Sequence, residues 1–158
     1  MMILMISATI CFASPSKNNH SYYGKCYNSY FITKDTDILT TMNTLIENKD
    51  LDQKQFTCNQ FSFMETKNKE YVLDVDTVYN NIPYLIQFTG IQTTNNNGRV
   101  MIPSNIILSH YDGTPIKTYS QNQIIGVCDI DLKDDNQFNC LVALQDTDHT
   151  IAIKIRFK

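Results

Sequence analysis

Residues 124–158 alternate apolar and polar side chains in one consistent antiparallel register. If Cys128 lies opposite Cys140, Gly126 lies opposite Val142, and the first turn falls on the polar segment 133–135. A second turn at residues 146–149 continues the register, and the facing pairs are then Leu144 and Ile151, Val142 and Ile153, Cys140 and Ile155, and Phe138 and Phe157. A slip of one residue would move all these side chains to the opposite face. We therefore predict a three-stranded meander with one apolar face.

This register also predicts a Cys128–Cys140 disulfide, and the cysteine count agrees with it. Residues 1–13 form an uncharged apolar segment, too short to cross a membrane as a helix and typical of a secretory signal peptide cleaved after Ala13. Cleavage would remove Cys11 and turn five cysteines into four. In an oxidising compartment the remaining cysteines, Cys26 and Cys58, are then expected to form a second disulfide.

One helix and a series of strands precede the meander. Residues 35–49 carry apolar side chains at helical spacing, with Asp35 as the expected N-cap, and five of them are predicted to face a sheet: Ile38, Leu39, Met42, Leu45 and Ile46. Residues 71–79 and 84–88 alternate as strands do, and a turn separates a strand ending near Thr94 from one starting at Arg99. Asp112-Gly113 favours a hairpin with a type I′ turn.

These patterns predict a single, mainly β domain over residues 14–158. The chain has 158 residues, 42% of them hydrophobic, and no linker or internal repeat divides it. We expect an antiparallel β-sandwich or open barrel of about seven or eight strands, with one N-terminal helix packed on it. With a net charge of −3 and scattered basic residues, the composition argues against a nucleic-acid partner, and no segment after the signal is apolar enough to span a membrane.

Tyrosines gather around Cys26 and are the candidate binding residues. Tyr22, Tyr23, Tyr27 and Tyr30 lie within nine residues of one another. Tyrosine combines a large apolar ring with a hydroxyl and is enriched at protein interfaces, so this segment is a candidate contact surface. The alternative is structural: the rings cover an edge of the core around Cys26. Just before them, Asn19-His20-Ser21 is the chain's single N-glycosylation sequon.

Candidate catalytic and metal-binding residues are few. The three histidines are His20, in the polar leader, His110, beside the Asp112-Gly113 turn, and His149, near Asp146 and Asp148. An aspartate can orient an imidazole for base catalysis, and two carboxylates with an imidazole can hold a metal, but aspartates are also ordinary turn residues. The acidic stretch 129–135 lacks the glycine and glutamate of a calcium loop, and no phosphate-binding, hydrolase or zinc motif is present. We therefore expect no metal, no cofactor and no enzyme activity.

The leading hypothesis is a small secreted or periplasmic domain that binds another protein, of the envelope or of a host, by surface complementarity, as an inhibitor does. A second is a structural subunit of an envelope or surface-appendage complex assembled by edge-strand addition, because the alternating residues 151–157 read as an edge strand. A third is a small hydrolase with a site near His110 or His149.

Overall fold

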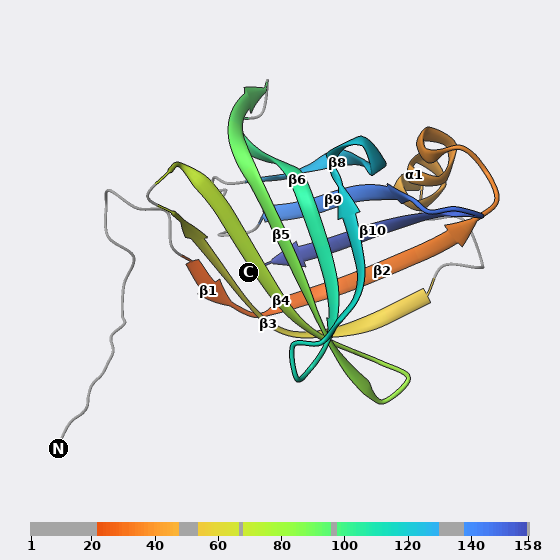
Figure 1. The fold of residues 1–158 in the computed structure, drawn as a ribbon, viewed down its shortest axis with the longest axis horizontal. Helices are drawn as coiled ribbons and strands as arrows, with labels where there is room; N and C mark the ends of the chain where they lie inside the picture. Colours follow the sequence, from red (N-terminus) through yellow and green to blue (C-terminus); the bar gives the residue numbers. More distant parts are fainter. Residues whose placement is uncertain (1–21, 48–53, 67, 96–97, 130–137, 158) are drawn as a thin grey trace, which may run out of the picture.

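The computed structural model describes residues 22–47, 54–66, 68–95, 98–129 and 138–157. The predicted signal peptide, the leader with the sequon at Asn19, and the last predicted residues of the helix all lie outside these ranges. Ten strands, one α-helix and one 3₁₀ turn make up the described part of the chain (Figure 1). In chain order they are β1 (Tyr22–Gly24), β2 (Cys26–Lys34), α1 (Ile38–Glu47), β3 (Lys54–Glu65), β4 (Glu70–Tyr79), β5 (Ile82–Asn95), β6 (Gly98–His110), β7 (Pro115–Ser120), η2 (Gln121–Gln123), β8 (Ile124–Asp129), β9 (Phe138–Gln145) and β10 (Thr150–Phe157).

Eight of the strands close into an antiparallel barrel. Neighbouring strands follow the order β3-β2-β10-β9-β8-β6-β5-β4, and pairing of β3 with β4 joins the two ends. The two short strands add to this wall, β1 along β3 and β7 along the second half of β6. The mainly β prediction is thus confirmed, but the alternatives of a sandwich and an open barrel are both wrong in detail, because the sheet closes on itself. Alternating side chains mark two faces of a strand equally well in either architecture.

The C-terminal meander has the predicted register. Cys128 pairs with Cys140 and Gly126 with Val142, and β9 and β10 pair residue for residue from Phe138 and Phe157 to Gln145 and Thr150. The expectation that residues 151–157 form an edge strand is wrong, because β10 pairs with β9 on one side and with β2 on the other. The last strand therefore offers no free edge to a neighbouring subunit.

Two hairpin turns lie side by side at one end of the barrel, and their geometries differ from expectation. Between β6 and β7, Gly113 has a φ of +93°, whereas Asp112 does not have a positive φ. Asp112 instead accepts a hydrogen bond from the backbone N–H of Thr114 at 2.9 Å, so this turn is not type I′. Between β4 and β5, Asn80 and Asn81 both have positive φ values, 52° and 66°. The two-residue asparagine turn is therefore the one that has the backbone conformation of a type I′ hairpin.

The helix packs on the outer surface of the barrel, as predicted, but starts later and buries fewer residues. Asp37, not Asp35, is the N-cap: its carboxylate accepts hydrogen bonds from the backbone N–H and the hydroxyl of Thr40 at 2.9 and 2.7 Å. These bonds lower the pKa of Asp37. Leu39 and Ile46 are 61% and 49% exposed, so two of the five expected core positions are wrong. The packed stripe is narrower, because residues one position apart on a helix point about 100° apart.

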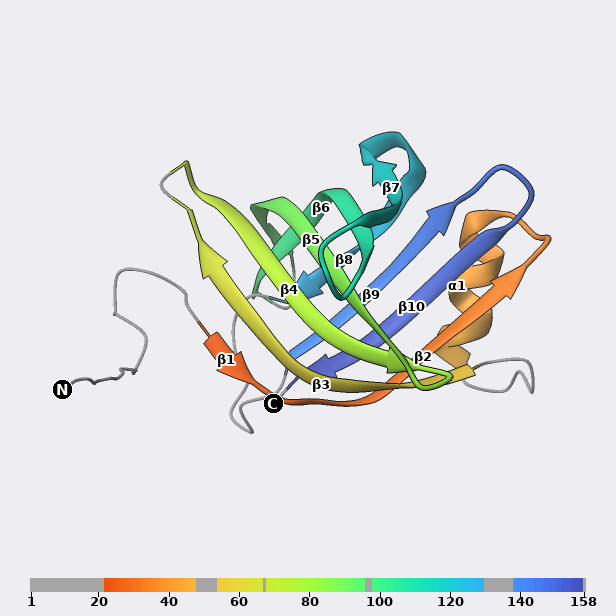
Figure 2. The ribbon, with the colours of Figure 1, turned by 60° about the horizontal axis from the view of Figure 1, so that its bottom comes forward.

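Leu45 anchors α1 against three neighbouring strands. It is fully buried together with Ile32 of β2, Ala143 of β9 and Ala152 of β10. The two alanines let the helix approach the sheet closely, and Figure 2 shows α1 beside the outer surface of β10 and β2. The Thr150 hydroxyl also donates to the carbonyl oxygen of Thr36 at 2.8 Å, just before the helix. The helix therefore supports the barrel wall from outside.

The barrel interior is divided into two halves along the strands. In the part that we call the closed half, buried side chains fill the space, and both predicted disulfides, Cys26–Cys58 and Cys128–Cys140, are formed there. The closed half consists of Cys26, Cys58, Phe61, Phe63, Tyr71, Leu73, Val75, Phe88, Met101, Cys128, Cys140, Val142, Ile155 and Phe157. The two disulfides fit an oxidising, extracytoplasmic environment. The other half contains the candidate site.

Candidate functional site

An apolar cavity of about 430 Å³ occupies the other half of the barrel, which we call the open half. Its walls come from eight strands, β2 to β7 together with β9 and β10. The lining residues are Phe31, Phe56, Thr77, Tyr79, Tyr84, Ile86, Ile106, Leu108, His110, Ile116, Tyr119, Leu144, Ile151 and Ile153. Small-molecule sites in proteins typically measure about 300–1,000 Å³ and are lined mainly by apolar side chains with a few polar groups. Size and lining both match such a site.

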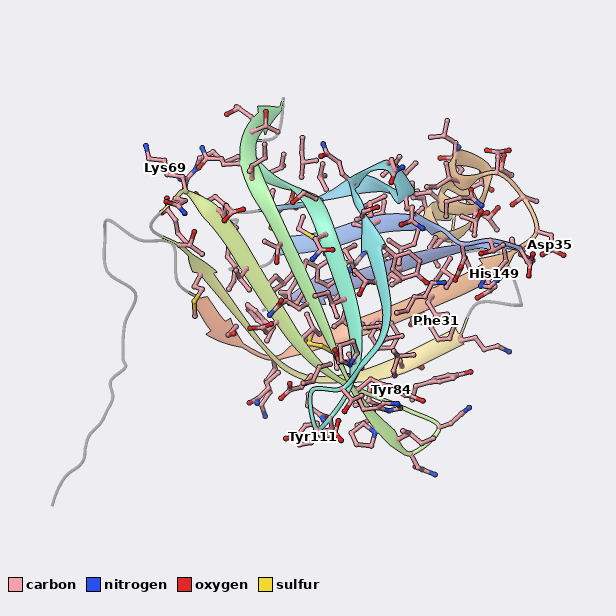
Figure 3. The ribbon with its side chains drawn as sticks, viewed as in Figure 1. Phe31, Asp35, Lys69, Tyr84, Tyr111 and His149 are labelled. Carbon is pink, nitrogen blue, oxygen red and sulfur yellow. A yellow bond between two sulfur atoms is a disulfide. The ribbon has the colours of Figure 1, made fainter. Side chains whose placement is uncertain are left out.

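Strand alternation and three turns determine where the cavity opens. Inward-facing residues next to the turns at 80–81, 111–114 and 146–149 all lie at one end of the barrel. Figure 3 shows Tyr84, Tyr111 and Phe31 toward this end and Lys69, from the opposite turn, far from them. Exposure follows the same direction: Ile86, Ile106 and Leu144 are buried deep in the cavity, whereas His110 and Ile116 are exposed at its rim. We call this rim the mouth.

The closed half forms the floor of the cavity. The rings of Phe63 and Tyr71 stack with their centroids 5.4 Å apart, and those of Phe61 and Phe157 meet edge-on at 4.6 Å. Such ring pairs bury large apolar surfaces at native packing density. The Tyr71 hydroxyl donates to Oε1 of Gln92 at 2.7 Å, so its polar atom is satisfied. The side chains that fill this half thus prevent the cavity from running through the barrel.

Polar groups of the cavity gather at the mouth. The Tyr84 ring stacks near the imidazole of His110, with centroids 6.4 Å apart, and the Tyr79 ring meets Phe31 edge-on at 5.1 Å. Thr77 donates its hydroxyl hydrogen to the carbonyl oxygen of Tyr84 at 3.3 Å, so it is already engaged. Within the described part of the chain, the hydroxyls of Tyr79 and Tyr84 have no hydrogen-bond partner. Both are therefore free to bond with a ligand.

Asp146 joins the β9–β10 turn to β7 at the side of the mouth. Its carboxylate lies 2.8 Å from Nζ of Lys117, accepts a hydrogen bond from the Tyr119 hydroxyl at 3.2 Å, and lies 3.8 Å from Nε2 of His149. The hydrogen bond from Lys117, followed by that from the backbone N–H of Thr147, lowers the pKa of Asp146. Burial and the neighbouring carboxylate raise the pKa of Tyr119 to about 12. This cluster fastens β7, whose one partner among the described strands is β6.

Of the four tyrosines singled out from the sequence, Tyr30 has a described side chain, and it is not among the residues that line the cavity. Tyr22 and Tyr23 lie in β1 and Tyr27 lies in β2, and their side chains are outside the described part of the structure. Tyr30 is half-buried on the outer face, where its ring lies 5.5 Å from Nζ of Lys154 and packs near the helix. A contact role for these four residues stays a prediction.

The two candidate histidines lie at the same end of the barrel, and the aspartate near each of them is already engaged by other groups. His110 stacks on Tyr84, while the neighbouring Asp112 is engaged by Thr114. His149 faces Asp146, whose carboxylate already binds Lys117 and Tyr119. Within the described ranges, no hydrogen bond links either imidazole to a serine, threonine or cysteine side chain, and the same residues contain no group of three or more potential metal ligands.

Sequence reasoning missed the cavity-lining residues of β4 to β6, such as Tyr79, Tyr84 and Leu108. The signal was present in the turns: if the sheet closes, the inward side chains beside residues 80–81, 111–114 and 146–149 meet at one opening. Without closure, those side chains read only as the apolar face of a sheet. The mouth thus depends on a long-range pairing, that of β2 with β10.

Comparison with models of protein families, with curated proteins and with solved structures found no match to this chain. In the described part of the chain, α1 is neither long nor apolar enough to cross a membrane.

Proposed function

We propose that this protein binds a small, largely apolar molecule in the open half of its barrel, without catalysing a reaction. The cavity carries the proposal: about 430 Å³ lined almost entirely by carbon, open at one end and closed by packed rings at the other. Barrels of eight strands are just wide enough to be filled by side chains or to hold one small ligand. Here one half is filled and the other is hollow. Filling the hollow half with an apolar body removes its walls from water.

We further propose that the protein works outside the cytoplasm, secreted or periplasmic, after removal of residues 1–13. The apolar N-terminal segment, the even number of cysteines that remains and the two disulfides support this location. A binding protein for an apolar molecule is useful in such a compartment, because the molecule is poorly soluble in water.

A neutral fluorescent probe, N-phenyl-1-naphthylamine, tests the binding. If each non-hydrogen atom contributes about 0.3 kcal/mol of binding free energy, this probe is expected to bind with a Kd of the order of tens of micromolar to millimolar. The probe's fluorescence should rise with saturation at one site per chain. Absence of saturable binding by the oxidised protein would refute the proposal.

The variant Ile151→Trp tests whether the probe binds in the cavity. Ile151 is a half-buried lining residue, and an indole at this position takes up space that a ligand needs. We expect probe affinity to fall at least tenfold. Ile91→Trp is the matched control, because Ile91 lies outside the cavity lining and is 54% exposed. The same substitution there should leave the affinity within twofold.

Binding of another protein at the mouth is a second candidate, and one observation favours it. Ile82, Tyr111 and Ile116 are 48%, 62% and 42% exposed and belong to the two hairpins around the opening. Exposed apolar groups beside a pocket are typical of an interaction surface. In affinity capture from envelope or host extracts, a specific partner should be lost with Ile82→Asp and Tyr111→Asp together. Loss of the partner with His110→Ala or His149→Ala alone would point away from this apolar surface.

A further inference from the structure

We propose that the cavity selects uncharged amphiphiles, with the apolar body in the open half and a hydroxyl, ester or amide group at the mouth, and rejects carboxylates of the same length. This inference rests on the proposed function, since it names the class of molecule that the cavity takes. Three observations support it: the described lining has no formal charge, Lys117 at the β7 side of the mouth is already paired, and free hydrogen-bonding groups lie at the mouth.

Among the described residues, the lining contains no lysine, arginine, aspartate or glutamate. Its polar members, among the described residues, are Thr77, three tyrosines and His110. A carboxylate that leaves water pays a large desolvation penalty unless an opposite charge meets it. The desolvation of a hydroxyl or an amide costs much less free energy, and one or two hydrogen bonds offset that cost. The composition of the wall therefore favours a ligand without charge.

Lys117, a cation at the β7 side of the mouth, is not available to a ligand. Lys117 follows Ile116 in β7, and its Nζ lies 2.8 Å from the carboxylate of Asp146. The same Nζ lies 5.9 Å from the ring centroid of Tyr119, so the ammonium is held against β7. Asp112, in the β6–β7 turn, adds a second carboxylate beside the opening. On this side of the mouth, an incoming anion thus meets a lysine that Asp146 already neutralises and the carboxylate of Asp112.

The positions of the polar groups determine how an amphiphile lies. Deep in the cavity, Ile86, Ile106 and Ile153 offer only carbon. At the mouth, the hydroxyls of Tyr79 and Tyr84 have no partner within the described residues, and the His110 imidazole can accept or donate a hydrogen bond. The apolar chain therefore points inward and the polar group meets these side chains.

Competition between two ligands of equal length tests the selection. The oxidised protein, loaded with N-phenyl-1-naphthylamine at pH 8, is titrated with 1-dodecanol and with dodecanoate below their aggregation limits. We expect dodecanol to displace the probe at a concentration at least tenfold lower. If the probe binds but dodecanoate displaces it as well as dodecanol does, or if neither does, the inference is wrong while the proposed function stands. If the probe itself does not bind, the proposed function fails and the inference with it.

A pair of lysine substitutions distinguishes an effect of the cavity lining from an effect of surface charge at this end of the barrel. Ile116 lines the mouth and Ile82 does not, although both are isoleucines on hairpins there and are 42% and 48% exposed. Ile116→Lys supplies a free counter-ion, so we expect the preference for dodecanol to shrink to threefold or less. Ile82→Lys should keep it at tenfold or more. Equal effects of the two variants would overturn the proposal, because selection would then depend on surface charge and not on the wall of the cavity.

Discussion

In the closed half of the barrel, stacked rings and two disulfides support the wall from inside, whereas in the open half the support comes from outside. The same strands run through both halves. The halves differ in the side chains that point inward and in whether the helix covers the outer face. Phe31, Leu144 and Ile151 face the cavity, and their chain neighbours Ile32, Ala143 and Ala152 lie under the helix.

This arrangement separates two tasks that usually compete in a small barrel. A filled interior stabilises the fold but leaves no room for a ligand, and an empty interior sacrifices packing contacts. Here the closed half contributes packing and cross-links, and α1 buries the outer side of β2, β9 and β10 where the inner side is hollow. A hollow half can therefore exist without destabilising the chain as a whole.

Truncation of a ring in the closed half should have the largest effect on stability. Phe88 is fully buried there, and Phe88→Ala is expected to lower the free energy of unfolding by about 3–5 kcal/mol. Leu108 lines the cavity and is half-buried, so Leu108→Ala should cost only about 1 kcal/mol. Urea unfolding of the oxidised proteins measures both. Equal losses at the two positions would mean that the halves do not differ in packing.

Loss of the helix anchor should affect stability and binding together. Leu45 is fully buried between α1 and the barrel, so Leu45→Ala should cost about 2–4 kcal/mol. Because the outer side of the cavity wall loses its support, probe affinity should also fall, by threefold or more. Exposed Leu39 provides the control: Leu39→Ala should leave both quantities close to those of the original chain. Weakened unfolding stability with unchanged probe affinity would show that the helix does not support the cavity.

The smallest effect on the free energy of unfolding is expected for Asp146→Asn, and this effect depends on pH. Its pKa is lowered in the folded protein, chiefly by Lys117, so ionised Asp146 stabilises the fold above the carboxyl's ordinary value of 3.8. The contribution is lost as the pH falls through the lowered pKa. Because the pair is partly exposed, Asp146→Asn should cost less than about 1 kcal/mol at pH 7, and this cost should shrink as the pH falls below 3.8. Chemical unfolding over this pH range checks this, with Asp148→Asn as the exposed neighbour. A cost that stays constant as the pH falls would contradict the assignment.

The strand register and the disulfides were predictable because they depend on local alternation. One choice, Cys128 opposite Cys140, placed Phe138, Val142 and Leu144 on the same face as Ile153 and Phe157, and the structure has that register. With Cys11 assigned to the predicted signal peptide, Cys26 and Cys58 were then the two cysteines left to pair. The helix was also predictable from spacing, although its cap depended on the side-chain bonds of Asp37, which a sequence pattern does not distinguish from those of Asp35.

Barrel closure and the cavity were not predictable in the same way. Closure depends on pairing of β2 with β10, near the two ends of the described chain, and alternation alone does not say where a sheet ends. The cavity depends on the summed volumes of inward side chains from all around the barrel. Phe63, Phe88 and Phe157 fill one end, whereas Thr77, Leu108 and Ile151 leave the other open. The alternation of apolar and polar side chains along the strands, with its period of two residues, is the same at both ends.

The central claim is that ligand binding belongs to the open half. Backbone amide chemical shifts of the isotope-labelled, oxidised protein, followed while 1-dodecanol is added, test it most directly. We predict saturable shifts for Phe31, Tyr84 and His110, with those of Phe63, Phe88 and Phe157 nearly unchanged. Saturable shifts confined to the closed half, or none anywhere up to the solubility limit of the alcohol, would contradict the claim.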